Sequence, residues 1–320
     1  VDVKIMVDAL GSRLFPLSFF KLLVGAGAEI KFFNPLRLWR FGVRDHRKLL
    51  ICDDEIAFVG GFNISDEYNG DGVTCGWCDL GACIESAALL EALTESFDGL
   101  FVLADFHRKP LLRLRVFKRK RKSHARAAGK VLLSHPGLGW SPFQRALHRD
   151  FAAAREIKII SAYFLPTRRL RRDLRRAARR GVRVQLILAG KTDVPVAQLA
   201  ARSFFQRLLN TGVEIYEYQP QILHAKLIVS DRAAYVGSSN LDVRSLNLNY
   251  ELMLRFEDEK IVAGAREIFE NTLKNSCRVE VGQWRESRTF WQRWKERWAH
   301  FLLARIDPFI ALRQFDAMKK

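Results

Sequence analysis

His46-Arg47-Lys48-Leu49-Leu50-Ile51-Cys52-Asp53 is a stretch that returns later in the chain as His224-Ala225-Lys226-Leu227-Ile228-Val229-Ser230-Asp231. In both copies an apolar run follows the lysine, which predicts a strand. Side chains two apart on a strand point to the same face. Each copy is therefore expected to present one imidazole and one ammonium side by side.

A glycine-containing loop that ends in asparagine follows each copy, as Gly60-Gly61-Phe62-Asn63 and Gly237-Ser238-Ser239-Asn240. Together the copies offer two imidazoles, two positive charges and two amide donors, a set that suits a phosphodiester. A neutral histidine attacks phosphorus while a protonated one gives its proton to the leaving oxygen. Lysines and asparagines stabilise the phosphoryl oxygens, so neither a metal nor a cofactor is required. A single such motif would most simply be an exposed strand edge, but its duplication favours a site.

The repeat extends outward from the motifs. The strand-like stretch 1–7 matches 182–188, and 27–33 matches 212–218, each pair separated by a helical pattern that ends in glycine. Strands that alternate with helices predict α/β layering in both halves.

Residues 141–181 have no counterpart in the first half, because the matching region would precede Val1. They predict a helix, the strand 156–162 and an arginine-rich helix. We therefore expect the first repeat to lack roughly forty residues, and we favour a fragment over an unusually minimal domain.

The 320 residues carry 53 lysines and arginines against 35 acidic residues, a formal net charge of +18. This length predicts about two domains, and 48% hydrophobic with 28% charged residues excludes a disordered or low-complexity chain. The charge predicts an anionic partner, either nucleic acid or an acidic membrane. We expect a first repeat at 1–110, a basic linker at 111–140, a second repeat at 141–280 and a basic, tryptophan-rich tail at 281–320.

The five cysteines are too few and too scattered for a disulfide framework, which makes a reducing compartment the default. Cys75 and Cys78 form a lone CxxC pair without a second pair spaced for zinc, so we interpret them as ordinary thiols. The sequence contains no run of 18 uncharged apolar residues, the length that a membrane-spanning helix requires.

At the two motifs the sequence resembles the phospholipase D superfamily, with its paired HxKx4D motifs and glycine loops. Three passages are similar to bacterial cardiolipin synthases, and the tail is most similar to the subgroup without N-terminal membrane helices. These passages are Gly60-Gly61-Phe62-Asn63-Ile64-Ser65-Asp66-Glu67-Tyr68, Ile160-Ser161-Ala162-Tyr163-Phe164-Leu165-Pro166 and Gly237-Ser238-Ser239-Asn240-Leu241-Asp242-Val243-Arg244-Ser245.

The resemblance implies an α/β fold of two pseudo-symmetric α-β-α repeats with mixed sheets and an active site at their interface. It also implies phosphatidyl transfer through a phosphohistidine. The phospholipid partners would be phosphatidylglycerol and other anionic lipids, met at the cytoplasmic side of the inner membrane by a peripheral enzyme, and no nucleic acid is expected. The acceptor stays open among phosphatidylglycerol, phosphatidylethanolamine, glycerol and water.

The family pattern assigns His46 as nucleophile and His224 as general acid, although the two motifs are equivalent in sequence. The catalytic motif set is His46, Lys48, Asp53, Asn63, His224, Lys226, Asp231 and Asn240. Asp53 and Asp231 face the other side of their strands, where a structural role suits them better. Asp231 also lies one residue closer to its glycine loop than Asp53 does, a shortening that places Asn240 differently from Asn63.

Each histidine also needs a carboxylate that fixes its tautomer. In the family such acids follow the glycine loop, and Asp79 and Glu251 stand at the matching positions. The alternative for each is an ordinary surface acid.

Two further surfaces are basic. Nine arginines between Arg168 and Arg183 form the cationic face of an amphipathic helix, which suits solvent and lipid equally. In the tail, Trp291, Trp294 and Trp298 recur at helical spacing among arginines, which favours a membrane interface over packing on the second repeat. The central basic run, 118–122, is a solvated linker or one that also touches anionic lipid.

Three alternative functions remain. Two use the same catalytic motif on another substrate or reaction, and the third binds the membrane without catalysis. A superfamily nuclease or a phospholipid hydrolase would use the same histidines, and +18 suits a nuclease. The tryptophans and the synthase-like passages argue against a nuclease. An inactive membrane-binding fragment is the third rival.

Overall fold

The computed structural model of this chain describes residues 1–12, 17–35, 42–104, 129–137, 139–306 and 308. The first half contains β1 (Lys4–Asp8), α1 (Leu17–Gly25), β2 (Glu29–Phe33), β3 (Leu49–Cys52), β4 (Ile56–Gly60), the 3-10 turn η1 (Asp66–Tyr68), β5 (Gly81–Ile84) and α2 (Ala87–Phe101). The second half begins with β6 (Gly129–Ser134), α3 (Pro142–Ala153), β7 (Glu156–Ser161), α4 (Arg168–Arg179), β8 (Arg183–Ala189), α5 (Pro195–Arg202), α6 (Phe205–Leu209) and β9 (Glu214–Tyr218). It continues with β10 (Lys226–Ser230), β11 (Ala234–Gly237), α7 (Val243–Asn247), β12 (Glu251–Phe256), α8 (Glu259–Lys274), β13 (Ser276–Arg278), α9 (Val281–Glu286), α10 (Phe290–Phe301) and the π-helical turn η3 (Leu302–Ile306).

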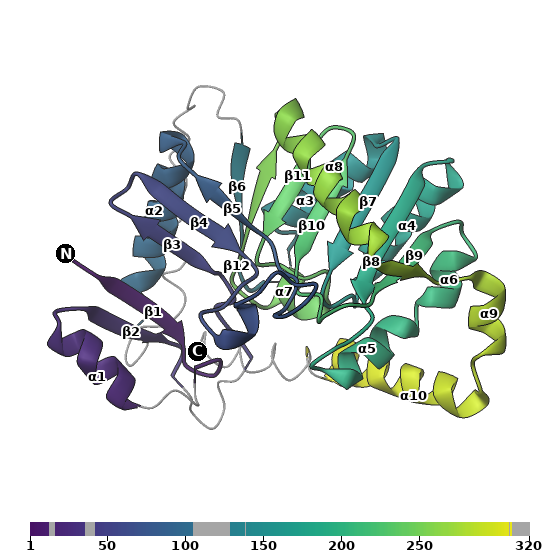
Figure 1. Cartoon of the computed structure of the whole chain (residues 1–320), viewed down its shortest axis with the longest axis horizontal. Coiled ribbons are helices and arrows are strands. Elements are labelled where there is room, and N and C mark those ends of the chain that lie inside the picture. The colour runs from purple at the N-terminus through teal and green to yellow at the C-terminus, as the bar shows by residue number, and fades with distance from the viewer. Residues whose placement is uncertain (13–16, 36–41, 105–128, 138, 307, 309–320) are drawn as a thin grey trace.

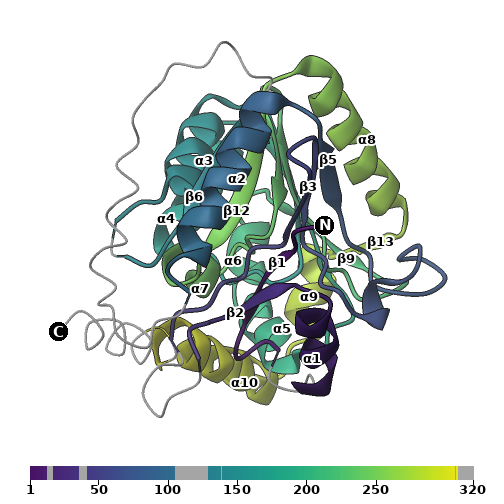
Figure 2. The same ribbon diagram turned by 90° about the vertical axis from the view of Figure 1, so that its left-hand side faces the viewer.

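An eight-stranded mixed sheet in the order β13-β9-β8-β7-β10-β11-β12-β6 forms the second half. Strands β7, β8 and β9 are parallel to one another, and β10 runs antiparallel to β7. Helices α2, α3 and α4 cover one face of the sheet and α8 covers the other (Figures 1 and 2). Because both faces are covered, β7 and β8 are buried along nearly their whole length.

The first half repeats this order with two smaller sheets. Strands β1 and β2 pair in parallel as β8 and β9 do, and β3-β4-β5 forms an antiparallel sheet like β10-β11-β12. In the second half β7 joins the two groups of strands, and the described residues of the first half contain no strand in that place. The predicted fold of two pseudo-symmetric α/β units with mixed sheets is confirmed.

A shared apolar core holds the two halves together. The residues of this core come from β4, β5 and α2 on one side and from β11 and β12 on the other. They are Ala57, Val59, Ile84, Leu89, Leu90, Leu93, Val236, Leu252, Leu254 and Phe256. Because burial of apolar area dominates folding free energy, this core fixes how the motifs of the two halves face each other.

Strand β6 lies inside the range 111–140 that we expected to be linker. It pairs antiparallel with β12 over six residues and closes one edge of the large sheet. The structure therefore starts the second unit at Gly129 rather than at 141. The central basic run of the expected linker lies outside the described residues.

The expected helices of the second half begin at strong N-caps. Ser141 and Gln144 form a capping box on α3, and Thr289 and Gln292 form another on α10. Helix α4 buries Leu170, Leu174 and Ala177 and presents its arginines outward, as its pattern predicted. Among the described residues, every helix is too short or too polar to cross a bilayer.

The strand ends that position the site lie at one edge of the large sheet. The carboxyl ends of β7, β8 and β9 share this edge because the strands are parallel. Lys226, the first residue of β10, pairs with Ser161 at the end of β7, so the amino end of β10 lies there too. Helices α5 and α7 follow this edge, and α10 packs on α5 (Figure 1). We call it the catalytic edge below.

Candidate active site

Both motif histidines lie just before the strands on which we expected them. His46 precedes β3, and His224 precedes β10, while Lys226 is the first residue of β10. Each is fixed by a backbone hydrogen bond across the two halves. The His46 N–H donates to the Tyr250 carbonyl (3.0 Å), and the His224 N–H donates to the Cys78 carbonyl (2.7 Å).

Each histidine receives its carboxylate from the other half of the chain. Glu251 Oε2 lies 3.1 Å from His46 Nδ1, and Asp79 Oδ2 lies 2.7 Å from His224 Nδ1. The preceding residues, Tyr250 and Cys78, are those that accept the backbone bonds above, so the exchange is symmetric. A carboxylate on Nδ1 holds the proton there and leaves the lone pair of Nε2 for chemistry.

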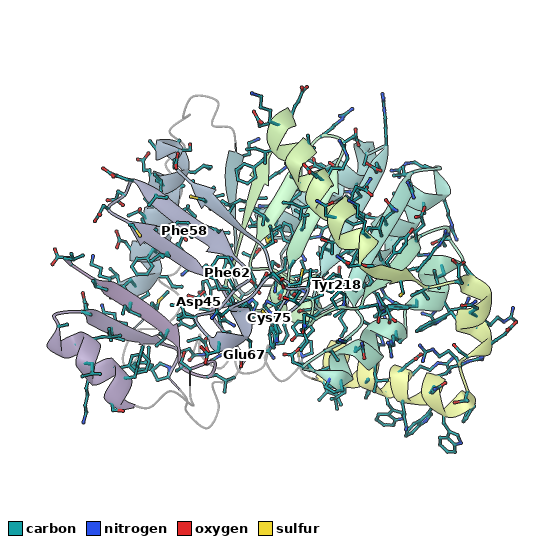
Figure 3. The ribbon with its side chains drawn as sticks, in the orientation of Figure 1. Asp45, Phe58, Phe62, Glu67, Cys75 and Tyr218 are labelled. Carbon is teal, nitrogen blue, oxygen red and sulfur yellow. The ribbon has the colours of Figure 1, made fainter. Side chains whose placement is uncertain are left out.

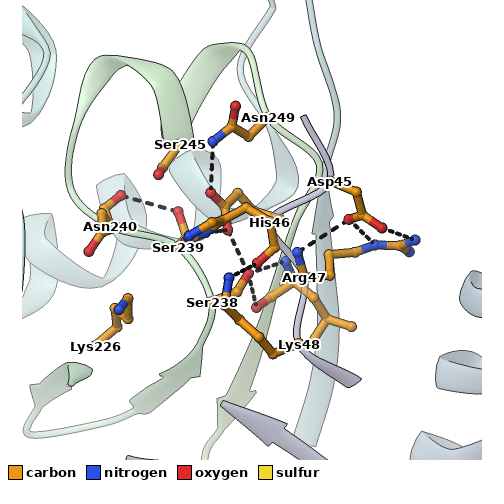
Figure 4. A network of polar contacts seen from close by, with 12 residues as sticks. Asp45, His46, Arg47, Lys48, Lys226, Ser238, Ser239, Asn240, Ser245 and Asn249 are labelled. Carbon is orange, nitrogen blue, oxygen red and sulfur yellow. Dashed lines mark hydrogen bonds and ion pairs between the residues drawn. The ribbon is translucent and has the colours of Figure 1, made fainter. Parts of the chain in front are cut away.

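Glu251 is fully buried and holds several donors at once (Figure 4). Ser238 Oγ donates to its Oε2 (2.6 Å) and Asn249 Nδ2 donates to its Oε1 (3.4 Å). Burial by itself would raise the pKa of Glu251, but His46, Lys48 and the Ser238 hydroxyl outweigh burial and lower that pKa. Glu251 is therefore ionised at neutral pH and stabilises positive charge on His46.

Asp79 has less space around it than Glu251 and has no counterpart of the Ser238 hydroxyl as a donor. Its Oδ1 accepts the Leu80 N–H (2.7 Å), and its side chain is 6% exposed. Gly61, the counterpart of Ser238, packs directly on this carboxylate. A Cβ at position 61 would lie 2.8 Å from Asp79 Oδ2 and nearer still to Oδ1. Position 61 therefore favours glycine, because the Asp79 carboxylate lies where the Cβ of any other residue would be.

The two lysines lie beside the two histidines. Lys48 Nζ donates to the His46 carbonyl (2.8 Å), and Lys226 Nζ lies 3.2 Å from His224 Nε2. Burial lowers the pKa of both lysines, that of Lys226 to about 7. Each lysine interacts electrostatically with groups of the other half, since Lys48 affects the pKa of His224 and Asp79 affects the pKa of Lys226. The four motif side chains form one electrostatic site.

The backbone around His46 is tied to α2 and β1. Arg47 donates to Asp45 (2.9 Å) (Figure 4) and to the Ser96 hydroxyl (2.7 Å), and the Asp45 N–H donates to Asp8 (3.0 Å). These bonds fix the segment that carries the histidine, because its backbone is outside any regular strand.

His224 is enclosed by aromatic rings. Tyr68 and Trp77 from the first half lie 5.4 and 5.5 Å from its ring, and Tyr163 lies 6.4 Å away. Burial is the main reason that the pKa of His224 falls to about 4; the Asp79 hydrogen bond opposes the fall and the charge on Lys226 adds to it. His224 is therefore neutral at pH 7 in the unliganded chain. The side chain of His46 is more open, at 29% exposed against 6% for His224.

The loop that supplies Asp79, Tyr68 and Trp77 crosses from the first half onto the second. The Tyr218 hydroxyl on β9 donates to the Gly72 carbonyl (2.7 Å), and Figure 3 shows Cys75 of this loop beside Tyr218 at the centre of the molecule. The contact explains why a first-half carboxylate reaches a second-half histidine.

The two motif asparagines differ in their surroundings. Asn240 is 3% exposed, and its Oδ1 lacks a hydrogen-bond partner among the described residues. Asn63 is exposed and donates to the Tyr68 hydroxyl (3.2 Å) instead.

The residues that follow the two asparagines also differ. Phe164, after β7, pairs with Leu241, the residue next to Asn240. The equivalent of Leu241 is Ile64, which is 96% exposed, and a cavity of about 460 Å³ opens beside it between Asn63, Tyr68 and Trp77.

The motif aspartates lie at the opposite ends of their strands from the site. Asp53 is exposed in the β3–β4 turn at φ 52°, and Asp231 accepts the Arg155 N–H (2.8 Å). Their inclusion in the catalytic set is therefore corrected, because a carboxylate at the far end of the strand cannot touch the reacting atoms. Asp231 ties the β10–β11 turn to the start of β7.

Sequence reasoning assigned no role to Tyr68, Trp77, Tyr163, Ser238 or Gly61. The three aromatic residues become site residues only through contacts between segments remote in the chain. Ser238 and Gly61 carried a usable signal, because they occupy the same position of the two glycine loops. The cysteines carry no disulfide, and the part of the chain that is described contains no cluster of three metal-binding side chains.

The fold is similar to that of two solved enzymes with low sequence identity. The phosphatidylserine synthase of Haemophilus influenzae Rd KW20 matches with a TM-score of 0.72 at 14% identity, over 97% of this chain and 82% of that one. A polyphosphate kinase from Porphyromonas gingivalis matches with a TM-score of 0.56 at 13% identity, over 88% of this chain and 40% of that one. The likeness shows the fold alone, because one fold hosts several chemistries.

Sequence comparison identifies the family. The family model described as "Cardiolipin synthase, PLD-like domain" matches residues 150–273. Cardiolipin synthase 1 of Bacillus anthracis is 32% identical over 292 residues, covering 88% of this chain but only 57% of that protein's length. Cardiolipin synthase B of Salmonella typhi is 32% identical over 326 residues, covering 94% of this chain and 75% of that protein. With the two motifs joined in one site, these matches show that the chain belongs to the cardiolipin synthase family of the phospholipase D superfamily.

Proposed function

We propose that this chain transfers a phosphatidyl group between phospholipids through a phosphohistidine, with phosphatidylglycerol as donor and acceptor. The observation that carries the proposal is the reciprocal pairing of two histidines with two buried carboxylates beside two lysines. Such a site activates a nucleophile and holds a proton donor on opposite sides of one phosphorus atom.

In the first step the Nε2 lone pair of one histidine forms a bond to phosphorus, and the bond to the head-group oxygen breaks. The other histidine gives its proton to that oxygen, and the alcohol leaves. In the second step the proton-donating histidine takes the proton of an incoming hydroxyl. The oxygen of this hydroxyl forms a bond to phosphorus, and the bond between phosphorus and Nε2 of the nucleophilic histidine breaks. We assign Lys48, Lys226 and the Nδ2 amide group of Asn240 as the donors to the phosphoryl oxygens.

We assign His46 as nucleophile because its ring is the more exposed of the two and is held by the fully buried Glu251. His224 is then the proton donor. Its low pKa describes the empty site; an anionic phosphodiester between the lysines places negative charge beside His224 and raises its pKa. The aromatic rings around His224 exclude the water that would compete for the phosphohistidine.

The test is a product assay with defined lipids. Vesicles of phosphatidylglycerol are expected to yield cardiolipin and free glycerol, resolved by mass, and His46→Asn and His224→Asn are each expected to abolish both. His148→Asn is the matched control, because His148 also bonds an aspartate through Nδ1 (Asp173, 2.9 Å) but lies on α3.

Three outcomes would contradict the proposal: phosphatidic acid without cardiolipin, nicking of DNA without lipid turnover, or activity in either histidine variant. An acid-quenched reaction followed by peptide mass analysis is expected to place the phosphatidyl group on His46. A phosphatidyl group on His224 would reverse the two roles and keep the reaction.

A further inference from the structure

Helix α10 presents a continuous row of apolar side chains to solvent. Its rings contact one another in sequence, Trp291 to Trp294 at 6.1 Å, Trp294 to Trp298 at 5.6 Å and Trp298 to Phe301 at 5.9 Å between centroids. The row consists of Phe290, Trp291, Trp294, Trp298, Phe301 and Leu302, which are 44–74% exposed. We call it the aromatic row. In Figure 3 the side chains on the lower side of α10 project away from the remainder of the ribbon.

The opposite side of α10 is already occupied. Ala299 belongs to the core with Trp284, and His300 packs edge-on against Phe204 at 4.7 Å. Glu296 is 5% exposed and lies 3.5 Å from Arg288. The helix is thus held on the second half by one side, so the aromatic row is a second, separate apolar side with no described partner.

Exposed cations flank the aromatic row. Arg285, Arg293, Lys295 and Arg297 are exposed and form no ion pair with a described residue, while Glu280 and Glu286 are the only exposed acids in the described stretch 280–301. Tryptophan beside arginine and lysine is the composition of a helix that lies in the interface of an anionic bilayer.

A second apolar patch lies at the same level in the first half. Phe19 and Leu22, three residues apart on one side of α1, are 45% and 77% exposed. Helix α1 follows β1 as α5 follows β8, and Figures 1 and 2 both show α1 and α10 at the bottom of the views, on the side of the molecule where the catalytic edge lies. A flat bilayer against this side would contact both helices.

We propose that α1 and the aromatic row of α10 together seat this protein on an anionic lipid bilayer, with the catalytic edge turned toward the head groups. The role given to the catalytic edge rests on the proposed function. The test does not, because lipid binding is measured without turnover. Phosphodiesters of the bilayer would then enter the site without leaving the surface.

Vesicle flotation tests the aromatic row first. The probe is vesicles of phosphatidylglycerol and phosphatidylcholine, and the variant replaces Trp291, Trp294 and Trp298 by serine. Each of these rings leaves about half of its surface free for the bilayer, so the variant is expected to bind at least about 100-fold more weakly. The matched control, Ile261→Ser with Ile268→Ser, removes exposed apolar groups of α8 and is expected to bind normally.

The cations are tested with the same assay. Replacement of Arg293 and Arg297 by glutamine is expected to weaken binding to anionic vesicles about fivefold per residue and to leave binding to neutral vesicles unchanged. Vesicle binding of the serine variant equal to that of the natural chain would overturn the proposal, provided that both chains unfold at the same temperature. Loss of oligonucleotide binding without loss of vesicle binding would overturn it too, in favour of nucleic acid.

Tryptophan fluorescence tests how the protein is oriented on the bilayer. With Trp291, Trp294 and Trp298 kept so that the chain binds, the fluorescence added by Leu22→Trp on α1 is expected to be quenched by bilayers of brominated lipid. The fluorescence added by Ile268→Trp on α8 is expected to be unaffected by them. Equal quenching of both added tryptophans would refute the orientation with both patches on the bilayer.

Turnover of short-chain phosphatidylglycerol below its micelle concentration separates the two proposals. Normal turnover in the serine variant supports docking as a distinct step, whereas absence of turnover in the natural chain that still binds vesicles refutes the proposed function alone.

Discussion

Replacement of Gly61 by alanine adds a single methyl group and is expected to disable a histidine in the other half of the chain. The new Cβ would lie 2.8 Å from Asp79 Oδ2 and nearer to Oδ1, so the carboxylate must move. Asp79 is the group that holds His224 Nδ1 at 2.7 Å. The methyl group therefore acts on His224 through a residue that it displaces.

The size of the effect follows from the bond that is lost. A hydrogen bond to a charged group contributes about 1.5–3 kcal/mol, which corresponds to a fall in kcat of about 10- to 150-fold. Stability is expected to change little, because the clashing atoms are the free end of a side chain and Gly61 has an ordinary negative or extended φ. Loss of the Asp79 contact also removes the influence that raises the pKa of His224, so that pKa falls below its value of about 4.

Initial rates of cardiolipin formation, thermal unfolding and the histidine NMR titration measure the three quantities. Gly264→Ala is the control, because a Cβ there meets nothing within 4 Å and lies in α8. A Gly61→Ala chain with unchanged kcat would refute the reasoning. A chain whose unfolding temperature drops sharply would show that the clash falls on the fold rather than on the carboxylate.

Three further predictions concern residues at and away from the site. Ser238→Ala removes the 2.6 Å bond to Glu251, which is expected to raise the pKa of Glu251 and to lower kcat about tenfold; an unshifted acidic limb of the pH–rate profile would contradict this. Asp231→Ala removes the acceptor of the Arg155 N–H and is expected to cost about 1 kcal/mol of unfolding free energy with kcat intact, so a large fall in kcat would return Asp231 to the catalytic set. His224 has a pKa of about 4 when folded against an ordinary 6.5, so the unfolded chain takes up the proton first as pH falls from 6.5 to 4. Unfolding free energy is expected to decrease over that window by at most about 3 kcal/mol, and His224→Asn should flatten the slope measured by denaturant titration.

The motif residues could be predicted from the sequence because their chemistry lies in short spacings. His46 with Lys48, and His224 with Lys226, required only the period of an extended chain. The pairing of His46 with Glu251 and of His224 with Asp79 could not be derived in the same way, since it depends on how the halves pack across their shared core. The family pattern named the two acids, and the structure shows to which histidine each belongs.

Other features were inaccessible to the sequence for identifiable reasons. Strand β6 follows a basic run that indicates a linker, and only its pairing with β12 makes it a strand. Asn63 and Asn240 look equivalent in their loops, but Asn240 is buried beside the pairing of Leu241 with Phe164, and Asn63 is exposed. Such differences come from tertiary neighbours, which carry no local pattern.

The exchange of carboxylates between the halves has a genetic consequence. A substitution that displaces Asp79 is felt at His224, and a substitution that displaces Glu251 is felt at His46, so the damage and the affected histidine always lie in opposite repeats. Second-site revertants of such mutations are therefore expected across the repeat boundary, and a hybrid built from repeats of two relatives would lose activity unless both contact pairs were transplanted together.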